Sequence, residues 1–583
     1  MGMPDVAKLL DPVAQIRQRR TAPLVLELDL TDGITDEVPA DPIGRILAKR
    51  RQRLTDVVEG IRRGALDPRV KALIAKVDGK PLGFAQVQEL RTAVRAFRNA
   101  GKTAVAWSES FGELGPGTVP YYLAAGFDEI ALLPTGTVGL TGLSIRTTFV
   151  RDAIDKLGVE YEVGARHEYK NAVNMFTERG YTEPHREATG RIVASLSDQV
   201  VEGIAAGRGM TQERVRELIG RGPFPASEAL ESGLVDRLAY RDEIIDDLLG
   251  RFASGEREGG QGGPGDGGRP MLQFVPRYQH RQVMAARVPA VRREGFIALI
   301  NAAGAVQTGR SRRSPMGGGS GMGSDTIAAA FRAARRDPHV KAVVFRVDSR
   351  GGSPVASDII RRECKLTSES GTPVIATMGD VAGSGGYYIT LGADAIVAHP
   401  GTITGSIGVF VGKPVLKGLM GRIGVSTDSI DGGEHSGMFA TDRGFTESEW
   451  ERVNTLLDTI YDDFTGKVAE ARGMSREQVH EVARGRVWTG RDAYERGLVD
   501  ELGGLDTAVR MARAKAGLGV SAPLRLFPQP NPLDRLVPAE SSEDKSESGE
   551  ARLSMWGPLA HIAERLGLPA EGPLVMPEMW EIR

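Results

Sequence analysis

One serine of the chain stands in a setting that could make it a nucleophile. Ser384 lies in the stretch Ala-Gly-Ser-Gly-Gly-Tyr at 382–387, after an apolar run at 373–377 and before a helical pattern. Small neighbours predict an exposed, sterically open hydroxyl, and a helix N-terminus favours a developing oxyanion. Turns of small residues are common, so this motif by itself is only a weak indication of acyl-transfer chemistry.

Two adjacent glycines could supply a second part of such a site. The stretch Asp-Ser-Arg-Gly-Gly-Ser at 348–353 follows a Val-rich run at 342–347. Gly351 and Gly352 leave backbone N–H groups unobstructed at the end of a strand, as an oxyanion hole requires. A tight strand-to-helix turn without a catalytic role is the alternative interpretation.

A nucleophilic serine also needs a base. His399 ends the strand after Ser384, and His435 lies in a glycine-containing loop, but neither has an obvious carboxylate to orient it. Lys170, in Glu-Tyr-Lys-Asn-Ala at 168–172, is the other candidate. A lone lysine is nearly always a solvated surface charge, so its interpretation depends on how the chain is organised.

The chain contains two copies of one domain. An apolar block at 70–78 returns at 340–348, and three further blocks return in the same order at nearly constant spacing. Small drifts in spacing at fixed order indicate insertions and deletions confined to loops. The other repeated blocks are Tyr-Tyr at 121–122 and 387–388, a Thr-acidic-Arg-Gly-aromatic-Thr block at 177–182 and 441–446, and Gly-Leu-Val-Asp at 233–236 and 497–500.

The two copies differ in a complementary way. Copy one has Thr118 at the position of Ser384, with Pro120 close by, and copy two has no lysine in its loop at 433–437, which corresponds to the loop of Lys170. One copy therefore keeps a lysine and the other keeps a serine loop. We expect one site assembled from both copies, with Ser384 as nucleophile and Lys170 as base.

Apolar runs predict the fold. Short stretches rich in Val, Ile and Ala are continuously apolar and alternate with amphipathic patterns. Continuous apolarity indicates strands covered on both faces, as in a parallel α/β sheet. Strands are expected at 24–30, 73–77, 104–107, 129–133, 296–302, 342–347, 373–377 and 395–399, and helices at 325–334, 449–472 and 476–484. The predicted divisions are an N-terminal segment (1–19), a first repeat (20–250), a Gly-rich linker and connector (251–292), a second repeat (293–520) and a C-terminal tail (521–583).

Composition excludes several classes of function. A net charge of −2 gives no electrostatic reason to expect nucleic acid as a partner. The single cysteine, Cys364, excludes a disulfide framework and a Cys-based zinc site, and we expect it on an apolar helix face. The longest apolar run, near 296–306, is about half of the ~20 residues that a spanning helix needs. Residues 1–20 lack the apolar core of a secretory signal.

Three motifs in order resemble the SppA family, also called protease IV or signal peptide peptidase, in its long duplicated form. They are Tyr-Lys-x-Ala around Lys170, the Asp-Ser-x-Gly-Gly-Ser stretch, and Ala-Gly-Ser-Gly-Gly-Tyr around Ser384. The resemblance covers about residues 20–530. It implies two tandem ClpP/crotonase-like α/β domains and a dyad of Ser384 and Lys170. It also implies an oxyanion hole of backbone N–H groups at Gly351, Gly352 and Gly385.

The resemblance carries expectations about function as well. It implies a serine endopeptidase that cleaves signal-peptide remnants and other apolar peptides, assembles into homo-oligomers and needs no cofactor. Long-form relatives typically carry an N-terminal membrane anchor, which we do not find, so we expect a peripheral membrane or cytoplasmic location. Arg350 stands where the family commonly has proline, which affects only the rigidity of the turn.

Two other functions remain open at this stage. A crotonase-type acyl-CoA enzyme would share the fold, but Ser384 and Lys170 would have no role in it. A non-catalytic scaffold descended from a protease would be expected to have lost one of the two, and both are present.

The proposed base imposes a condition on its surroundings. A free lysine has a pKa of about 10.4, and burial can lower it by 3–5 units. We therefore expect Lys170 in a closed, largely apolar crevice between the two copies.

The tail has apolar character of its own. Residues at 556–566 form an apolar stripe at helical spacing, and the segment 573–580 is apolar. Three interpretations are open: packing on its own domain, peripheral contact with a bilayer, or docking along a substrate groove or against a neighbouring subunit.

Overall fold

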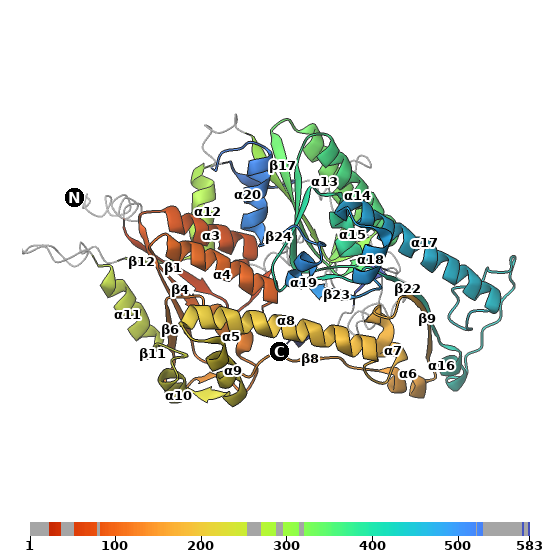
Figure 1. The fold of residues 1–583 in the computed structure, drawn as a ribbon, viewed down its shortest axis with the longest axis horizontal. Helices are drawn as coiled ribbons and strands as arrows, with labels where there is room; N and C mark the ends of the chain where they lie inside the picture. The colour runs from red at the N-terminus through yellow and green to blue at the C-terminus, as the bar shows by residue number, and fades with distance from the viewer. Residues whose placement is uncertain are drawn as a thin grey trace, which may run out of the picture. The chain divides into compact units, whose positions relative to one another are not determined.

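The computed structural model divides into two compact units (Figure 1). Unit 1 comprises Met1–Leu143 and Asp198–Val291 with Arg583, and unit 2 comprises Ser144–Ser197 and Arg292–Ile582. The segment Ser144–Ser197, which the repeat pattern assigns to copy one, therefore belongs to unit 2. The residues described are 22–35, 52–78, 82–253, 270–286, 295–313, 320–520, 522–528, 574–576 and 581–582.

Unit 1 is built on a six-stranded parallel sheet of order β11-β6-β5-β4-β1-β12. Four of these strands are the apolar runs expected from the sequence, and helices connect them, as parallel neighbours require. The strands are β1 (Leu24–Asp29), β4 (Val70–Lys76), β5 (Thr103–Ser108), β6 (Glu129–Leu132), β11 (Arg237–Leu238) and β12 (Met271–Phe274). The main helices are α3 (Leu54–Leu66), α4 (Phe84–Asn99), α5 (Thr118–Ala124), α9 (Gln212–Arg221), α11 (Arg241–Arg251) and α12 (Val275–Ala286).

Unit 2 repeats this plan around an eight-stranded sheet. Its main path is β23-β21-β19-β17-β13-β25, and β20 pairs with β19 and with β24. The strands are β13 (Phe296–Ala303), β17 (Val340–Ser349), β19 (Val374–Gly383), β20 (Ala395–Ala398), β21 (Ile403–Gly405), β23 (Val487–Thr489), β24 (Glu501–Leu502) and β25 (Leu524–Leu526). The main helices are α13 (Ser324–Arg336), α14 (Pro354–Glu369), α17 (Glu447–Arg472), α18 (Arg476–Val482) and α20 (Leu505–Lys515).

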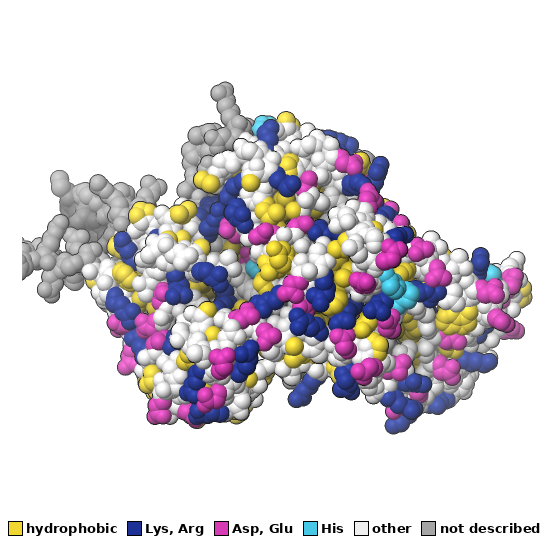
Figure 2. Space-filling model, viewed as in Figure 1, with side chains coloured by type: hydrophobic (Ala, Val, Ile, Leu, Met, Phe, Trp, Pro, Cys, Tyr) yellow, Lys and Arg dark blue, Asp and Glu magenta, His cyan; other side chains and the backbone are white. Residues whose placement is uncertain are grey.

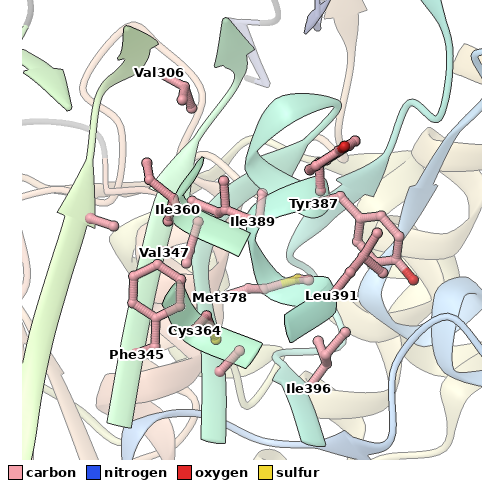
Figure 3. Packing of buried hydrophobic residues seen from close by; sticks show 14 of the residues in the cluster. Val306, Phe345, Val347, Ile360, Cys364, Met378, Tyr387, Ile389, Leu391 and Ile396 are labelled. Carbon is pink, nitrogen blue, oxygen red and sulfur yellow. The ribbon is translucent and has the colours of Figure 1, made fainter. Parts of the chain in front are cut away.

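Both faces of the unit 2 sheet are covered, which explains its continuously apolar strands. Along β13, Ala298 and Ile300 pack in the cluster with α13 and α14, whereas Ile297 and Leu299 pack against α20. This alternation follows from the two-residue period of a strand. In Figure 3, Phe345 and Val347 of β17 lie beside Ile360 and Cys364 of α14. Cys364 is fully buried on that helix, as the sequence predicts.

Two of the repeated sequence blocks, Tyr-Tyr and Gly-Leu-Val-Asp, make matching contacts in the two units. The hydroxyl of Tyr121 donates to the Leu234 carbonyl across 2.7 Å, and that of Tyr387 donates to the Leu498 carbonyl across 2.8 Å. The aspartate of each Gly-Leu-Val-Asp block also forms an ion pair with an arginine. Asp236 pairs with Arg208, and Asp500 pairs with Arg472. The repeats thus encode matching tertiary contacts, and the expected tandem α/β architecture is confirmed.

Ser144–Ser197 joins unit 2 through backbone pairing. Its strand β9 (Glu160–Arg166) runs antiparallel to β22 (Val409–Val415) over the whole length of both, as Figure 1 also shows. The segment continues through a short 3-10 helix (Asn171–Val173) and α7 (Asn174–Thr177) into α8 (Glu183–Arg208). This pairing places the lysine-bearing segment in the same unit as the serine loop.

The surface carries charges of both signs. Basic and acidic side chains are interspersed over the face drawn in Figure 2. Within the described residues, no helix combines the length and the apolarity that crossing a bilayer requires. The predicted apolar stripe at 556–566 lies outside the described residues, as do residues 1–19.

Candidate active site

Ser384 forms the sharp turn between β19 and the short helix α15 (Gly385–Tyr388). Its backbone has φ 54° and ψ −117°, a conformation that is unfavourable for a residue with a side chain. The turn is held by the backbone N–H of Ser384, which donates to the Gly405 carbonyl across 2.8 Å. A serine at a strained strand-to-helix turn is the arrangement of a nucleophile elbow.

Ser384 is completely buried, so the expectation of an exposed serine was wrong. Small neighbours do leave its backbone open to close approach, but other groups fill the space. The Lys170 side chain reaches the hydroxyl, β21 pairs with β19 through Gly383, and Met576 of the tail packs on Gly383.

Lys170 lies between β9 and the 3-10 helix that follows it. Its backbone N–H donates to the His167 carbonyl across 3.0 Å. Gly485 packs directly against it, since a Cβ added at Gly485 would lie 2.7 Å from the Lys170 Cα. Gly485 has φ 83°, so both its conformation and its lack of a side chain are needed for this close approach.

The Lys170 amine meets the serine hydroxyl inside unit 2. Its Nζ donates hydrogen bonds to Ser384 Oγ at 2.9 Å, to Ser406 Oγ at 3.0 Å and to the Ser406 carbonyl at 3.2 Å. The side chain has no carboxylate partner among these contacts. Burial lowers the pKa of Lys170 to about 7, because desolvation disfavours the charged amine. A substantial fraction of this lysine is therefore neutral at physiological pH.

Ser406 is a site residue that the sequence reasoning missed. It is fully buried, has φ 52°, and follows Gly405, whose carbonyl fixes the backbone of Ser384. A signal was available in the repeat, because Leu140 stands at the matching place in copy one, between the same flanking glycines. The comparison of copies would have found it if it had been extended past the serine and lysine loops.

The predicted glycines lie together beside Ser384. A Cβ added at Gly385 would lie 3.1 Å from the Gly351 Cα and 3.1 Å from the Gly352 nitrogen. Gly351 and Gly352 have φ values of 105° and 154°, and together form β18 (Gly351–Gly352). The Gly351 N–H donates to the Ser349 hydroxyl across 3.1 Å. The structure thus brings all three glycines to the turn that carries Ser384.

The histidines have other contacts. His435 lies 2.7 Å from the Ser448 hydroxyl, in a partly exposed loop, and the Ser384 hydroxyl is bonded to Lys170. Among the described residues, no group of three or more His, Cys, Asp or Glu side chains is arranged to hold a metal ion.

The matching loop of unit 1 has no serine. There the backbone N–H of Gly117 donates to the Gly139 carbonyl across 2.9 Å, as Ser384 does to Gly405 in unit 2. Gly117, rather than the neighbouring Thr118 expected from the sequence, makes this bond. The Thr118 hydroxyl instead accepts from the Thr141 N–H.

The family model and two sequence relatives agree on one family. The model of peptidase family S49 matches residues 96–250 and 367–519. The chain is 30% identical over 474 residues to the serine protease SPPA, chloroplastic, of Arabidopsis thaliana, covering 81% of this chain and 67% of that protein. It is 32% identical over 476 residues to protease 4 of Salmonella typhi, covering 80% of this chain and 72% of that protein. A ClpP1 mutant structure from Listeria monocytogenes covers 36% of this chain and 94% of its own, with 14% identity and a TM-score of 0.24.

Proposed function

Because the chain belongs to peptidase family S49 and is a serine-type peptidase, we propose that Ser384 is its nucleophile and Lys170 its general base. The observation that carries this proposal is the 2.9 Å separation of Lys170 Nζ and Ser384 Oγ, with the amine wholly buried. A neutral amine at that distance is placed to accept the hydroxyl proton as the oxygen attacks.

The reaction follows from these two groups. Ser384 Oγ attacks the carbonyl carbon of a peptide bond while its proton passes to the neutral Nζ of Lys170. The resulting ammonium gives that proton to the leaving amine as the C–N bond breaks, which forms an acyl-enzyme. Water then attacks the ester carbonyl while Lys170 accepts its proton. The ester C–O bond breaks as Lys170 gives that proton to Ser384 Oγ, which releases the acid product and restores the serine.

Backbone N–H groups would stabilise the oxyanion of each tetrahedral intermediate. The Gly351 N–H is directed at the Ser349 hydroxyl, so Gly352 and Gly385 are the stronger candidates within the glycine set. Ser349 then holds the turn in place, since its own hydroxyl donates to the Gly304 carbonyl across 2.6 Å.

The resemblance to the SppA family extends the proposal to substrates and assembly. We propose that the enzyme is an endopeptidase for signal-peptide remnants and other apolar peptides, and that it forms homo-oligomers. Sizing of the purified protein tests the second statement.

The decisive test is covalent labelling. A fluorophosphonate probe should modify Ser384, located by mass spectrometry of the digested protein, and the Ser384→Ala variant should not react. An apolar fluorogenic peptide should be hydrolysed by the wild type alone. Hydration or hydrolysis of an acyl-CoA without labelling of Ser384 would instead favour a crotonase-type enzyme.

A further inference from the structure

A short strand of the tail lies along the glycine turn of the active site. This strand, β26 (Leu574–Val575), is antiparallel to β18, with Val575 opposite Gly351 and Leu574 opposite Gly352. The backbone N–H of Met576 donates to the Arg350 carbonyl across 2.8 Å. The tail thus has the extended conformation and main-chain pairing by which peptides add to an open strand edge.

The side chain of Met576 reaches the residue next to the nucleophile. It is only 2% exposed, and a Cβ added at Gly383 would clash with its Sδ. Gly383 is the last residue of β19 and directly precedes Ser384. An apolar side chain therefore rests on bare backbone beside the reactive hydroxyl, in a space that exists because residue 383 is glycine.

The strand also contacts a second segment near the site. β26 touches β22 as well as β18, and β22 begins shortly after Ser406. The tail accordingly contacts two segments near Ser384 and Lys170. Ser384 is fully buried and Lys170 is 3% exposed. A substrate cannot reach a serine in this state, so catalysis requires a rearrangement beside Ser384, and the tail is one of the segments packed there.

We propose that residues 574–576 occupy the peptide-binding position of the active site, so that the tail is a competitive inhibitor built into the chain. The inference rests on the proposed function of Ser384 and Lys170. It also defines the substrates that displace the tail: extended peptides that pair with β18 and place an apolar side chain on Gly383. A tethered segment acts at an effective concentration on the order of millimolar, so weak contacts suffice to keep the site closed.

The test compares full-length variants. Met576→Asp places a charge where Met576 is buried, and Val520→Asp makes the same kind of change at a position that is 89% exposed. Two rates are measured for each protein: labelling of Ser384 by a fluorophosphonate, and kcat/KM for an apolar fluorogenic peptide. A tail that closes the site in about 90% of wild-type molecules leaves about one in ten open, so releasing the tail should raise both rates about tenfold in Met576→Asp. Val520→Asp should match the wild type.

A synthetic peptide spanning residues 570–580 provides a second test that is independent of protein folding. Added to Met576→Asp, it should raise KM without changing kcat, as a competitive inhibitor does. The same peptide with Asp in place of Met576 should inhibit at least about tenfold more weakly, because the charged side chain cannot fill the apolar space above Gly383. Met576→Ala, which introduces no charge, runs in parallel and should show a smaller rise in both rates.

The outcomes separate the inference from the proposed function. Equal labelling and equal kcat/KM in all variants, with no inhibition by the peptide, would overturn the inhibitor role and leave the peptidase assignment intact. No labelling of Ser384 in any variant, including Met576→Asp with its site open, would overturn the proposed nucleophile instead.

Discussion

The amine of Lys170 and the hydroxyl of Ser384 lie 2.9 Å apart, although 214 residues separate them in the chain. Nothing local in the sequence brings them together. The antiparallel pairing of β9 with β22 carries the lysine into unit 2, and the turn after β19 presents the serine. When both groups of such a pair are buried, desolvation lowers the pKa of the amine and leaves it neutral enough to accept a proton. The chemistry of the pair therefore depends on packing as well as on residue identity.

Replacing Ser384 by alanine should abolish peptide hydrolysis, with a loss of at least about 1,000-fold in kcat/KM. The change removes one hydroxyl and its bond to Lys170, and it leaves the core clusters of unit 2 untouched. Far-ultraviolet circular dichroism and sizing should therefore match the wild type. Activity within tenfold of the wild type would refute the nucleophile assignment.

Lys170→Arg should be nearly as damaging as Lys170→Ala, with losses of at least about 100-fold in kcat for both. Arginine keeps a positive charge but does not deprotonate in a protein, so it cannot accept the serine proton. Steady-state kinetics of both variants with an apolar peptide checks this. An arginine variant that keeps most of its activity would show that Lys170 contributes charge rather than basicity.

The pH dependence of kcat/KM should show a single rise centred near pH 7. In the proposed mechanism the neutral amine of Lys170 accepts the proton, and burial holds the pKa of Lys170 at about 7. Activity should therefore fall about tenfold for each pH unit below that value and level off above it. Histidine titrates in the same range, so His399→Ala and His435→Ala are the controls, and both should keep the activity and the profile. A profile that flattens in either variant would transfer the base to that histidine.

Local pattern was sufficient to predict four strands of each sheet, because parallel strands buried on both faces leave continuous apolar runs. The short strands β11, β12, β21, β23, β24 and β25 were not predicted. The strand β17, expected at 342–347, extends over Val340–Ser349. Comparison of the copies was enough to single out Ser384 and Lys170. The path of the lysine segment was not predictable in this way, since β9 joins unit 2 through non-local backbone pairing that leaves no periodic signature.

The burial of Ser384 escaped prediction for a related reason. Small residues around a serine indicate that its backbone can be approached closely, but they do not show what approaches it. Here Lys170 approaches Ser384, and Met576, which is 193 residues further along the chain, approaches its neighbour Gly383. Contacts of that range depend on the whole fold.

Ser406→Ala should reduce kcat by about 10- to 100-fold, the range expected for one hydrogen bond to a charged group. The Ser406 hydroxyl accepts from Lys170 Nζ at 3.0 Å, and this bond orients the amine toward Ser384. Because the bond favours the charged amine, its loss should lower the pKa of Lys170 further and shift the acid limb of the pH profile to lower pH. Ser406→Thr, which keeps the hydroxyl, should recover part of kcat. A loss of activity with an unshifted profile would assign Ser406 a structural role only.

Gly485→Ala should disable the enzyme by displacing Lys170. A Cβ at this position would lie 2.6 Å from the Lys170 nitrogen and 2.7 Å from its Cα, closer than real Cβ contacts, so the lysine backbone must shift. Displacement of a base by about 1 Å costs on the order of 100-fold in rate, and we expect a loss of that size in kcat.

The matched control for this change is Gly473→Ala. Gly473 has φ 62°, so alanine meets a similar backbone penalty there, but nothing lies within 4 Å of the added Cβ. It should lose stability of about 1 kcal/mol and keep the wild-type kcat. Thermal unfolding and kcat measured side by side separate the two effects. If both variants lose activity in proportion to stability, the close packing of Gly485 on Lys170 does not position the base.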